Sequence, residues 1–167
     1  MAVDADTFKG AMSRFASGVT VVTVHTDAGD YGMTASAFCS LSLEPPLVLV
    51  CVKRTAMTHQ RLMDADGFAI NLLSADQKDV SNRYAGWGAL PQDDFSDQGD
   101  ARGSVSGAPL LDGAMAWIDC RRHAVHDGGD HSIFVGRVEG VSLHGDRDTL
   151  EPLLYFAGSY RQAGERL

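Results

Sequence analysis

Residues 19–43, VTVVTVHTDAGDYGMTASAFCSLSL, decide the fold of this chain. The first eight positions are β-branched almost throughout, and the polar turn DAGD at residues 27–30 separates them from a second run with strand character. β-Branched residues favour strands, and a short connection that contains Gly and Asp is typical of a hairpin. The stretch therefore predicts an antiparallel pair of strands.

More strand-like runs follow this pair. LVLVCV at residues 47–52 is continuously apolar, which predicts a central strand covered on both faces, and FAINLL at residues 68–73 predicts another buried strand. The runs at residues 114–126 and 132–144 flank the turn DGGD, which predicts a long hairpin.

The helices predicted between these strands are short. Phe8, Met12 and Phe15 have helical spacing, with Asp4 or Asp6 as a cap and Gly18 as the end, and residues 56–65 and 76–85 predict two further helices. Residues 86–113, rich in Gly, Asp, Ser and Pro, predict a functional excursion within one domain. Six or seven strands without regular alternation with long helices predict a mainly β fold, an antiparallel barrel, in a single domain of residues 1–167.

Composition narrows the possible partners. The 167 residues are 44% hydrophobic and carry a net charge of −8, without a basic block, which argues against binding to nucleic acid or to an anionic membrane. The acidic start MAVDAD and a longest apolar run of eight residues, 45–52, predict no leader or membrane span and a cytoplasmic protein. Cys39, Cys51 and Cys120 are expected to be reduced, small core residues.

Two segments could hold a ligand. If residues 34–43 form one strand, Thr34, Ser36, Ser40 and Ser42 share a face, which is either a hydrogen-bonding wall or an ordinary half-solvated surface. Lys53 and Arg54, followed by Thr55 and Thr58, begin a predicted helix and form either a phosphate site or a solvated helix cap.

Other motifs point less clearly to a function. Cys120, His123 and His126 invite a zinc interpretation, but strand alternation puts His123 on the opposite face, so no metal site is predicted. His131, beside two glycines, could contact an anionic ligand. The segment YFAGSY at residues 155–160 could stack on a planar ring or close the barrel.

Five segments, taken in order, resemble one known family. They are FKGAMSRFASGVTVVT at 8–23, GMTASAFCSLSLEPPLVLVCV at 32–52, KDVSNRYAG at 78–86, GDHSIFVGRV at 129–138 and YFAGSY at 155–160. Together they are similar to the flavin reductases, which include the small reductase components of two-component flavin monooxygenases. The resemblance implies a homodimeric split β-barrel of the FMN-binding type that takes a hydride from NADH or NADPH, passes it to FMN or FAD, and supplies reduced flavin to a partner monooxygenase.

The resemblance also implies roles for particular residues. His131 would position the nicotinamide as the catalytic residue. Independently of the resemblance, we expect Lys53 or nearby backbone amides to stabilise the negative charge that appears on the reduced ring. The implied NAD(P)H-binding residues are His131, Tyr155, Phe156, Gly158 and Tyr160. The implied flavin-binding residues are Gly32, Met33, Thr34, Ala35, Ser36, Ala37, Ser40, Cys51, Val52, Lys53, Met57, Thr58, Arg83 and Tyr84. Ala157 departs from the family pattern, in which a charged residue is frequent.

Two alternatives stay open at this point. A flavin-binding electron carrier or store on the same barrel would lack catalytic turnover. An oxidase related to the pyridoxamine phosphate oxidases would need a second phosphate site, whereas the sequence has one cationic cluster, Lys53 and Arg54.

Overall fold

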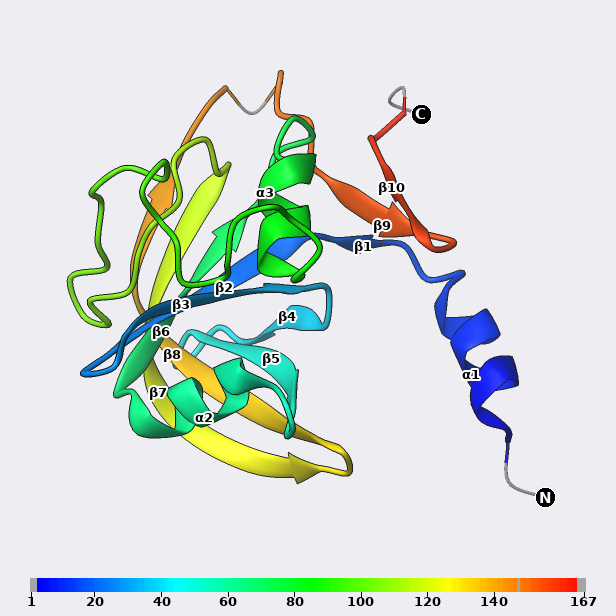
Figure 1. Cartoon of the computed structure of the whole chain (residues 1–167), viewed down its shortest axis with the longest axis horizontal. Helices are drawn as coiled ribbons and strands as arrows, with labels where there is room; N and C mark the ends of the chain where they lie inside the picture. The colour runs from blue at the N-terminus through cyan, green and yellow to red at the C-terminus, as the bar shows by residue number, and fades with distance from the viewer. Residues whose placement is uncertain (1–2, 147, 165–167) are drawn as a thin grey trace.

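The computed structural model describes residues 3–146 and 148–164. Its main element is a seven-stranded antiparallel sheet in the order β3-β2-β6-β7-β8-β5-β4, and a small sheet has the order β1-β9-β10 (Figure 1). The large sheet consists of β2 (Thr20–Thr26), β3 (Gly29–Ala35), β4 (Phe38–Ser42), β5 (Leu47–Lys53), β6 (Gly67–Leu72), β7 (Ala116–Gly128) and β8 (His131–Leu143). The small sheet consists of β1 (Ser17–Gly18), β9 (Leu154–Phe156) and β10 (Ser159–Arg161).

The large sheet wraps around one apolar core. This core takes buried side chains from several strands, among them Val22 and Val24 of β2, Val50 of β5, Phe68 of β6 and Phe134 of β8. Burying side chains of this size contributes roughly 1.5–3 kcal/mol each. Because residues from strands across the sheet meet in one cluster, the prediction of an antiparallel barrel with short helices is confirmed.

The first hairpin has the predicted form. β2 and β3 pair in antiparallel register from Thr20 opposite Ala35 to Thr26 opposite Gly29. β2 is also buried on its other face, where Val21 belongs to a second cluster with Leu73 and Tyr84. The β-branched run is therefore explained by a strand that packs against two cores.

Two predictions about the next strands are wrong. β5 is next to the edge strand β4 rather than central, and its burial alternates: Val48, Val50 and Val52 face the core, whereas Leu47, Leu49 and Cys51 are half-buried. Residues 34–43 are not one strand, because β3 ends at Ala35 and β4 begins at Phe38 and pairs with β5. The predicted row of hydroxyls is therefore divided: Thr34 is on β3, Ser36 lies in the break, and Ser40 and Ser42 are on β4, which does not pair with β3.

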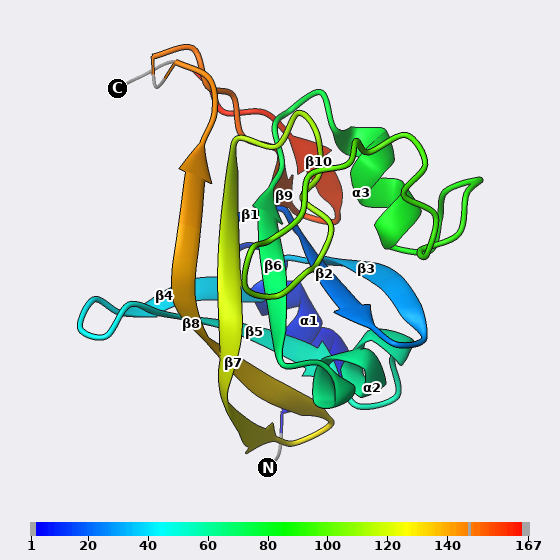
Figure 2. The ribbon, with the colours of Figure 1, turned by 90° about the vertical axis from the view of Figure 1, so that its left-hand side faces the viewer.

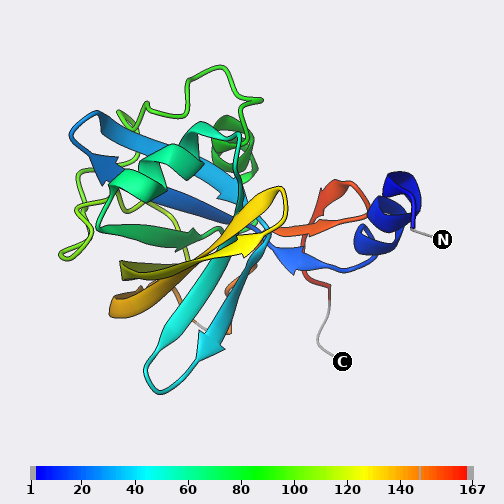
Figure 3. The same cartoon turned by 90° about the horizontal axis from the view of Figure 1, so that it is seen from below.

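The helices lie where the sequence predicts them, except that the first helix ends earlier than predicted. α1 (Ala5–Met12) is capped by Asp4, whose carboxylate accepts hydrogen bonds from the amides of Asp6 and Thr7, and it ends well before Gly18. α1 has no buried residue and stands away from the barrel beside the small sheet (Figures 1 and 3). The two other helices, α2 (Met57–Asp64) and α3 (Lys78–Tyr84), confirm the predicted positions.

The second hairpin is long and distorted. β7 and β8 form a ribbon that runs the length of the barrel (Figure 2), and their register shifts twice, between Asp119 and Cys120 and between Arg122 and Ala124. The second shift leaves His123 out of the pairing, so strict alternation does not continue past Arg122. No helix among the described residues is long and apolar enough to cross a membrane.

The three cysteines differ in environment. All three are free thiols, and only Cys120 is a core residue, with a pKa raised to about 12 chiefly by burial. Cys51 is half-buried and Cys39 is exposed, so the prediction of three core cysteines is correct for one of them.

Candidate functional site

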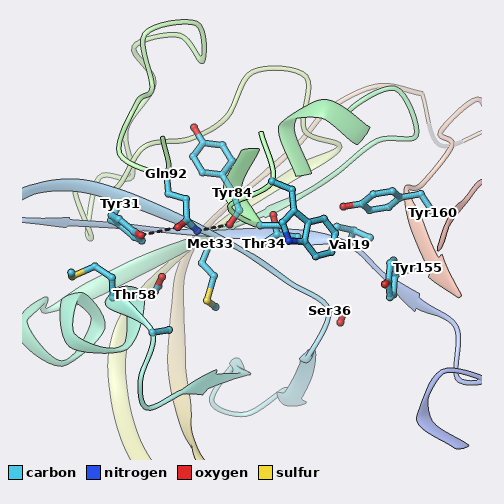
Figure 4. Close-up of a pocket in the computed structure, with 14 residues that line it drawn as sticks. Val19, Tyr31, Met33, Thr34, Ser36, Thr58, Tyr84, Gln92, Tyr155 and Tyr160 are labelled. Atoms are coloured by element: carbon cyan, nitrogen blue, oxygen red, sulfur yellow. Dashed lines mark hydrogen bonds between the residues drawn. The ribbon is translucent and has the colours of Figure 1, made fainter. Parts of the chain in front are cut away.

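A pocket of about 470 Å³ lies where β3, α2, α3 and the small sheet meet (Figure 4). Tyr31 and Thr58 lie at one end, and Tyr155 and Tyr160 lie at the other. The lining is mostly aromatic and hydroxyl side chains. Its residues are Val19, Tyr31, Met33, Thr34, Ser36, Ala56, Met57, Thr58, Tyr84, Ala85, Trp87, Gln92, Tyr155 and Tyr160.

A short chain of hydrogen bonds joins three elements around the pocket. The Thr34 hydroxyl on β3 donates to the Ser81 carbonyl on α3 at 2.6 Å. The Ser81 hydroxyl and the Tyr160 hydroxyl on β10 share a hydrogen bond of 2.9 Å. Since Ser81 is buried, this chain fixes the position of Tyr160 relative to β3.

Gln92, from the long excursion, organises the other end. The Tyr31 hydroxyl donates to its Oε1 at 2.8 Å, and its Nε2 donates to the Tyr84 carbonyl at 2.6 Å. The backbone adds a bond from the Gly32 amide to the Gln92 carbonyl at 2.9 Å. The excursion is therefore tied to β3 and α3, and it completes the pocket wall.

Gly32 has a packing role that the sequence did not reveal. A Cβ at this position would lie 2.5 Å from the Tyr84 ring, so the absence of a side chain lets β3 and α3 approach. Tyr84 is fully buried, its ring stacks on Phe95, and burial raises the pKa of its phenol. The glycine thus allows Tyr84 to pack, and no close approach of a ligand is needed to explain it.

The start of α2 forms one wall of the pocket. Its N-cap is Ala56, and no side chain caps the helix, so neither Thr55 nor Thr58 is the expected cap. Thr58 is buried and lines the pocket together with Met57. Uncapped amides at a helix start, beside a hydroxyl, favour an anion such as a phosphate.

Arg83 is engaged by a partner that the sequence did not predict. Its guanidinium forms a two-pronged ion pair with the Asp97 carboxylate, and only 12% of the Arg83 side chain is exposed. The hydrogen bond from Arg83 is the main reason that the pKa of Asp97 lies well below its usual range. Arg83 lies outside the pocket lining, and its charge is already balanced.

Lys53 and His131 lie together, but outside the pocket. They are cross-strand neighbours on β5 and β8, and the His131 ring contacts the Asp130 carboxylate at 2.8 Å. Arg54 is not a free cation, because it pairs with Asp127 at 2.8 Å. The expected cationic cluster is therefore divided, with Arg54 tied to the β7–β8 turn.

The site residues predicted from the sequence fall into two groups, those that line the pocket and those that do not. The pocket brings together Met33, Thr34, Ser36, Met57, Thr58, Tyr84, Tyr155 and Tyr160. It does not include Gly32, Ala35, Ala37, Ser40, Cys51, Val52, Lys53, Arg83, His131, Phe156 or Gly158. Ala35 and Val52 are core residues, so a ligand could reach them only through their backbone.

Sequence reasoning missed six lining residues. They are Val19, Tyr31, Ala56, Ala85, Trp87 and Gln92. Tyr31 lies on β3 directly before Gly32, so strand alternation with Met33 could have placed it on the same face. Gln92 and Trp87 belong to the irregular excursion, which has no periodicity from which a side chain's direction follows.

No group of three or more His, Cys, Asp or Glu residues within 3–146 and 148–164 is arranged to hold a metal ion.

Comparison with known proteins gives consistent matches. Residues 12–164 match the family model described as flavin reductase like domain. The chain is 43% identical over 157 residues to the reductase component of 4-hydroxyphenylacetate 3-monooxygenase from Thermus thermophilus, covering 94% of this chain and 95% of that protein. It is 42% identical over 149 residues to an NADH-dependent FAD reductase from Streptomyces globisporus, covering 89% and 80%. Among solved structures, BorF, the flavin reductase component of a bacterial two-component tryptophan halogenase, superposes with a TM-score of 0.86 at 42% identity, covering 98% of this chain and 100% of that one.

Proposed function

The chain belongs to the flavin reductase family, and from this premise we propose that it transfers a hydride from NADH or NADPH to FMN or FAD. The observation that carries the proposal is the pocket, which combines aromatic and hydroxyl walls with an uncapped helix start. A planar ring with a phosphorylated tail matches this combination. The pocket volume, about 470 Å³, lies within the range of small-molecule sites.

We assign the binding roles by position in the pocket. Met57 and Thr58, at the start of α2, hold the flavin phosphate, and Thr34 and Ser36 offer hydroxyls to the ring and ribityl chain. Bound flavin supplies the hydride-accepting chemistry, so the protein needs no acid–base triad. What the chain contributes is orientation, because the two reacting rings must approach to about 3–3.5 Å.

We further propose that His131 positions the nicotinamide, with Lys53 beside it. Lys53 and His131 face each other across β5 and β8 next to the turn that follows β7. Both side chains are accessible at the rim of the barrel, as a residue that meets an exchanging dinucleotide must be.

The protein is proposed to act as a homodimer in the cytoplasm. Apolar side chains of α1 and of the segment that follows it are exposed in the single chain: Phe8 by 60% and Met12 by 51% on α1, and Phe15 by 73% after it. A helix whose apolar face has no partner in its own chain is typical of a surface that packs against another chain. Three free thiols agree with a reducing compartment.

Reduced flavin is proposed to pass to a partner monooxygenase. Relatives of this chain are named as reductase components of such enzymes. Transfer by diffusion of the flavin requires only that the pocket be open to solvent.

Steady-state oxidation of NADH with a large excess of free FMN tests the activity. We expect many turnovers per protein chain, and parallel runs with FAD and with NADPH define both substrates. A single stoichiometric bleaching of bound flavin, with no further NADH consumed, would contradict the proposal and favour the electron carrier.

A further inference from the structure

Trp87 is a large aromatic side chain that lines the pocket and is nevertheless 71% exposed. Covering an indole ring buries a large apolar surface and stabilises the state in which it is covered. An indole left exposed at a pocket wall does not contribute this stabilisation to the folded chain. Trp87 has no assigned role in the residues proposed above.

The backbone of Trp87 is held firmly by the end of α3. The Gly86 amide donates to the Arg83 carbonyl at 2.9 Å, and the Trp87 amide donates to the Asn82 carbonyl at 2.9 Å. With φ of +79° at Gly86, this is the Schellman ending of a helix. Gly88 closes the segment, since a Cβ there would lie 2.6 Å from the Arg83 Cα.

The indole itself has no partner among residues 3–146 and 148–164, in contrast to the other tryptophan. Trp117 donates from Nε1 to the Leu111 carbonyl at 2.8 Å and meets the His144 ring edge-on at 4.1 Å. No hydrogen bond or ring contact of this kind involves the Trp87 side chain. The backbone of Trp87 is therefore held in place, while its ring is available to contact a ligand.

The loop that carries Trp87 also borders a second hollow. A second hollow of about 510 Å³ lies against the same loop and is lined by Gly86, Gly88 and Gln92. It shares Tyr31 and Gln92 with the first pocket. The residues on either side of Trp87 therefore border this hollow, whereas Trp87 itself lines only the first pocket of the two.

We propose that Trp87 is a stacking wall for the planar heteroaromatic ring of the bound nucleotide. This inference rests on the proposed function and adds a specificity-determining residue to it. The ring is the flavin isoalloxazine, or the adenine or nicotinamide of a dinucleotide, all of which present a flat π face to an indole.

Affinity measurements on Trp87→Ala and Trp87→Phe test the proposal by calorimetry. Loss of a stacking aromatic weakens binding of a base by about tenfold, whereas phenylalanine retains most of the affinity. Leu90→Ala is the matched control, because Leu90 is exposed in the same loop and lines the second hollow but not the first pocket. Its Kd values should equal those of the wild type.

The choice of ligand identifies the ring. Equal losses for FMN and FAD identify the isoalloxazine. A loss for FAD and AMP, with FMN unaffected, identifies adenine, and a loss for NAD⁺ alone identifies the nicotinamide.

Acrylamide quenching gives a readout that does not depend on activity. In Trp117→Phe, Trp87 is the remaining tryptophan of the two, and the stacking ligand should protect its emission from acrylamide. If that variant fails to fold, the difference between wild type and Trp87→Phe supplies the same signal.

Three results would distinguish a failure of the role of Trp87 from a failure of the proposed reductase activity. Unchanged Kd values and unprotected emission, with NADH oxidation intact, would overturn the role of Trp87 and leave the proposed function standing. Protection that appears with protein concentration alone would also overturn it, because a second copy would then cover the indole. Absence of turnover with nucleotide-protected Trp87 would refute the reductase activity while supporting the stacking wall.

Discussion

Ala157 is the non-glycine residue with positive φ within the described part of the chain, at 51°, in the turn between β9 and β10. The left-handed conformation costs an alanine about 1–2 kcal/mol relative to glycine, partly offset by the greater freedom of glycine in the unfolded chain. Ala157→Gly should therefore raise the free energy of unfolding by about 0.5–1 kcal/mol, measured by urea unfolding.

The next residue of the same turn provides the control. Gly158 has φ of +77°, and a Cβ there would meet nothing within 4 Å, so Gly158→Ala changes only the conformational cost. We expect this variant to lose about 1 kcal/mol. Equal stabilities for both variants and the wild type would mean that this turn is not formed in solution.

The Arg83–Asp97 ion pair predicts a specific dependence of stability on pH. The pKa of Asp97 is lower in the folded chain, chiefly because Arg83 donates to it, so the pair contributes fully above the unfolded pKa of about 3.9 and is lost as pH falls toward the folded value. Half of the Asp97 side chain is exposed, which limits its contribution to about 1 kcal/mol. Asp97→Asn should be less stable than wild type by that amount at pH 7.

As pH falls below about 4 toward the lower folded pKa of Asp97, the gap in unfolding free energy between Asp97→Asn and wild type should narrow progressively. Asp93→Asn, an exposed position of the same excursion outside the ion pair, should track the wild type at every pH. A gap that persists unchanged at acid pH would assign the loss to packing instead of charge.

At the scale of elements, Gly136 of β8 packs closely against side chains of β6 and β7. A Cβ there would lie 2.6 Å from the Phe68 ring and 2.9 Å from the Cys120 Cβ, and all three residues are buried. Overpacking a filled core costs about 1–3 kcal/mol. Gly136→Ala should lower the unfolding free energy by that amount, measured by chemical denaturation.

Gly140 on the same strand is the matched position. A Cβ there would lie 3.5 Å from the Asp119 Cβ, an ordinary contact, so Gly140→Ala should be neutral within about 0.5 kcal/mol. Similar losses at both glycines would point to a general effect on β8 and contradict the packing argument.

Most elements could be predicted from local pattern, because hairpins and short helices carry their signals in neighbouring residues. The run at 19–26, the turn at 127–130 and the helices α2 and α3 are examples. The position of β5 in the sheet could not be predicted in this way, because an apolar run does not show which elements cover the two faces of the strand. In the single chain, Leu47 and Leu49 are only half-buried, and the burial of Val50 comes from side chains distant in sequence.

The candidate site was predictable only where it lies on regular elements. Thr34 on β3 and Thr58 on α2 have directions that follow from strand and helix geometry. Gln92 reaches the site through contacts of the excursion with β3 and α3, and the Arg83–Asp97 pair joins α3 to the same excursion. Neither contact has a local sequence signal, because both depend on how an irregular segment folds back.

At the scale of the whole molecule, several large apolar side chains lie outside the barrel core and are exposed in the single chain. α1 buries none of its residues, and Leu143 at the end of β8 and Leu43 after β4 are also highly exposed. Surface of this kind is normally covered in an assembly. The proposed homodimer would cover it without changing the fold of either chain.

Charged substitutions on α1 test the proposed dimer without disturbing the core. Because α1 contributes nothing to the core of its own chain, Phe8→Glu combined with Met12→Glu should leave the barrel folded but abolish association. Sedimentation should give about 36 kDa for the wild type, twice the 17.9 kDa of one chain, and half that mass for the variant. Lys9→Glu, an exposed charge change on the same helix, should remain dimeric. A wild type that sediments as a single chain at micromolar concentration would refute the dimer, and a double variant that stays dimeric would move the interface away from α1.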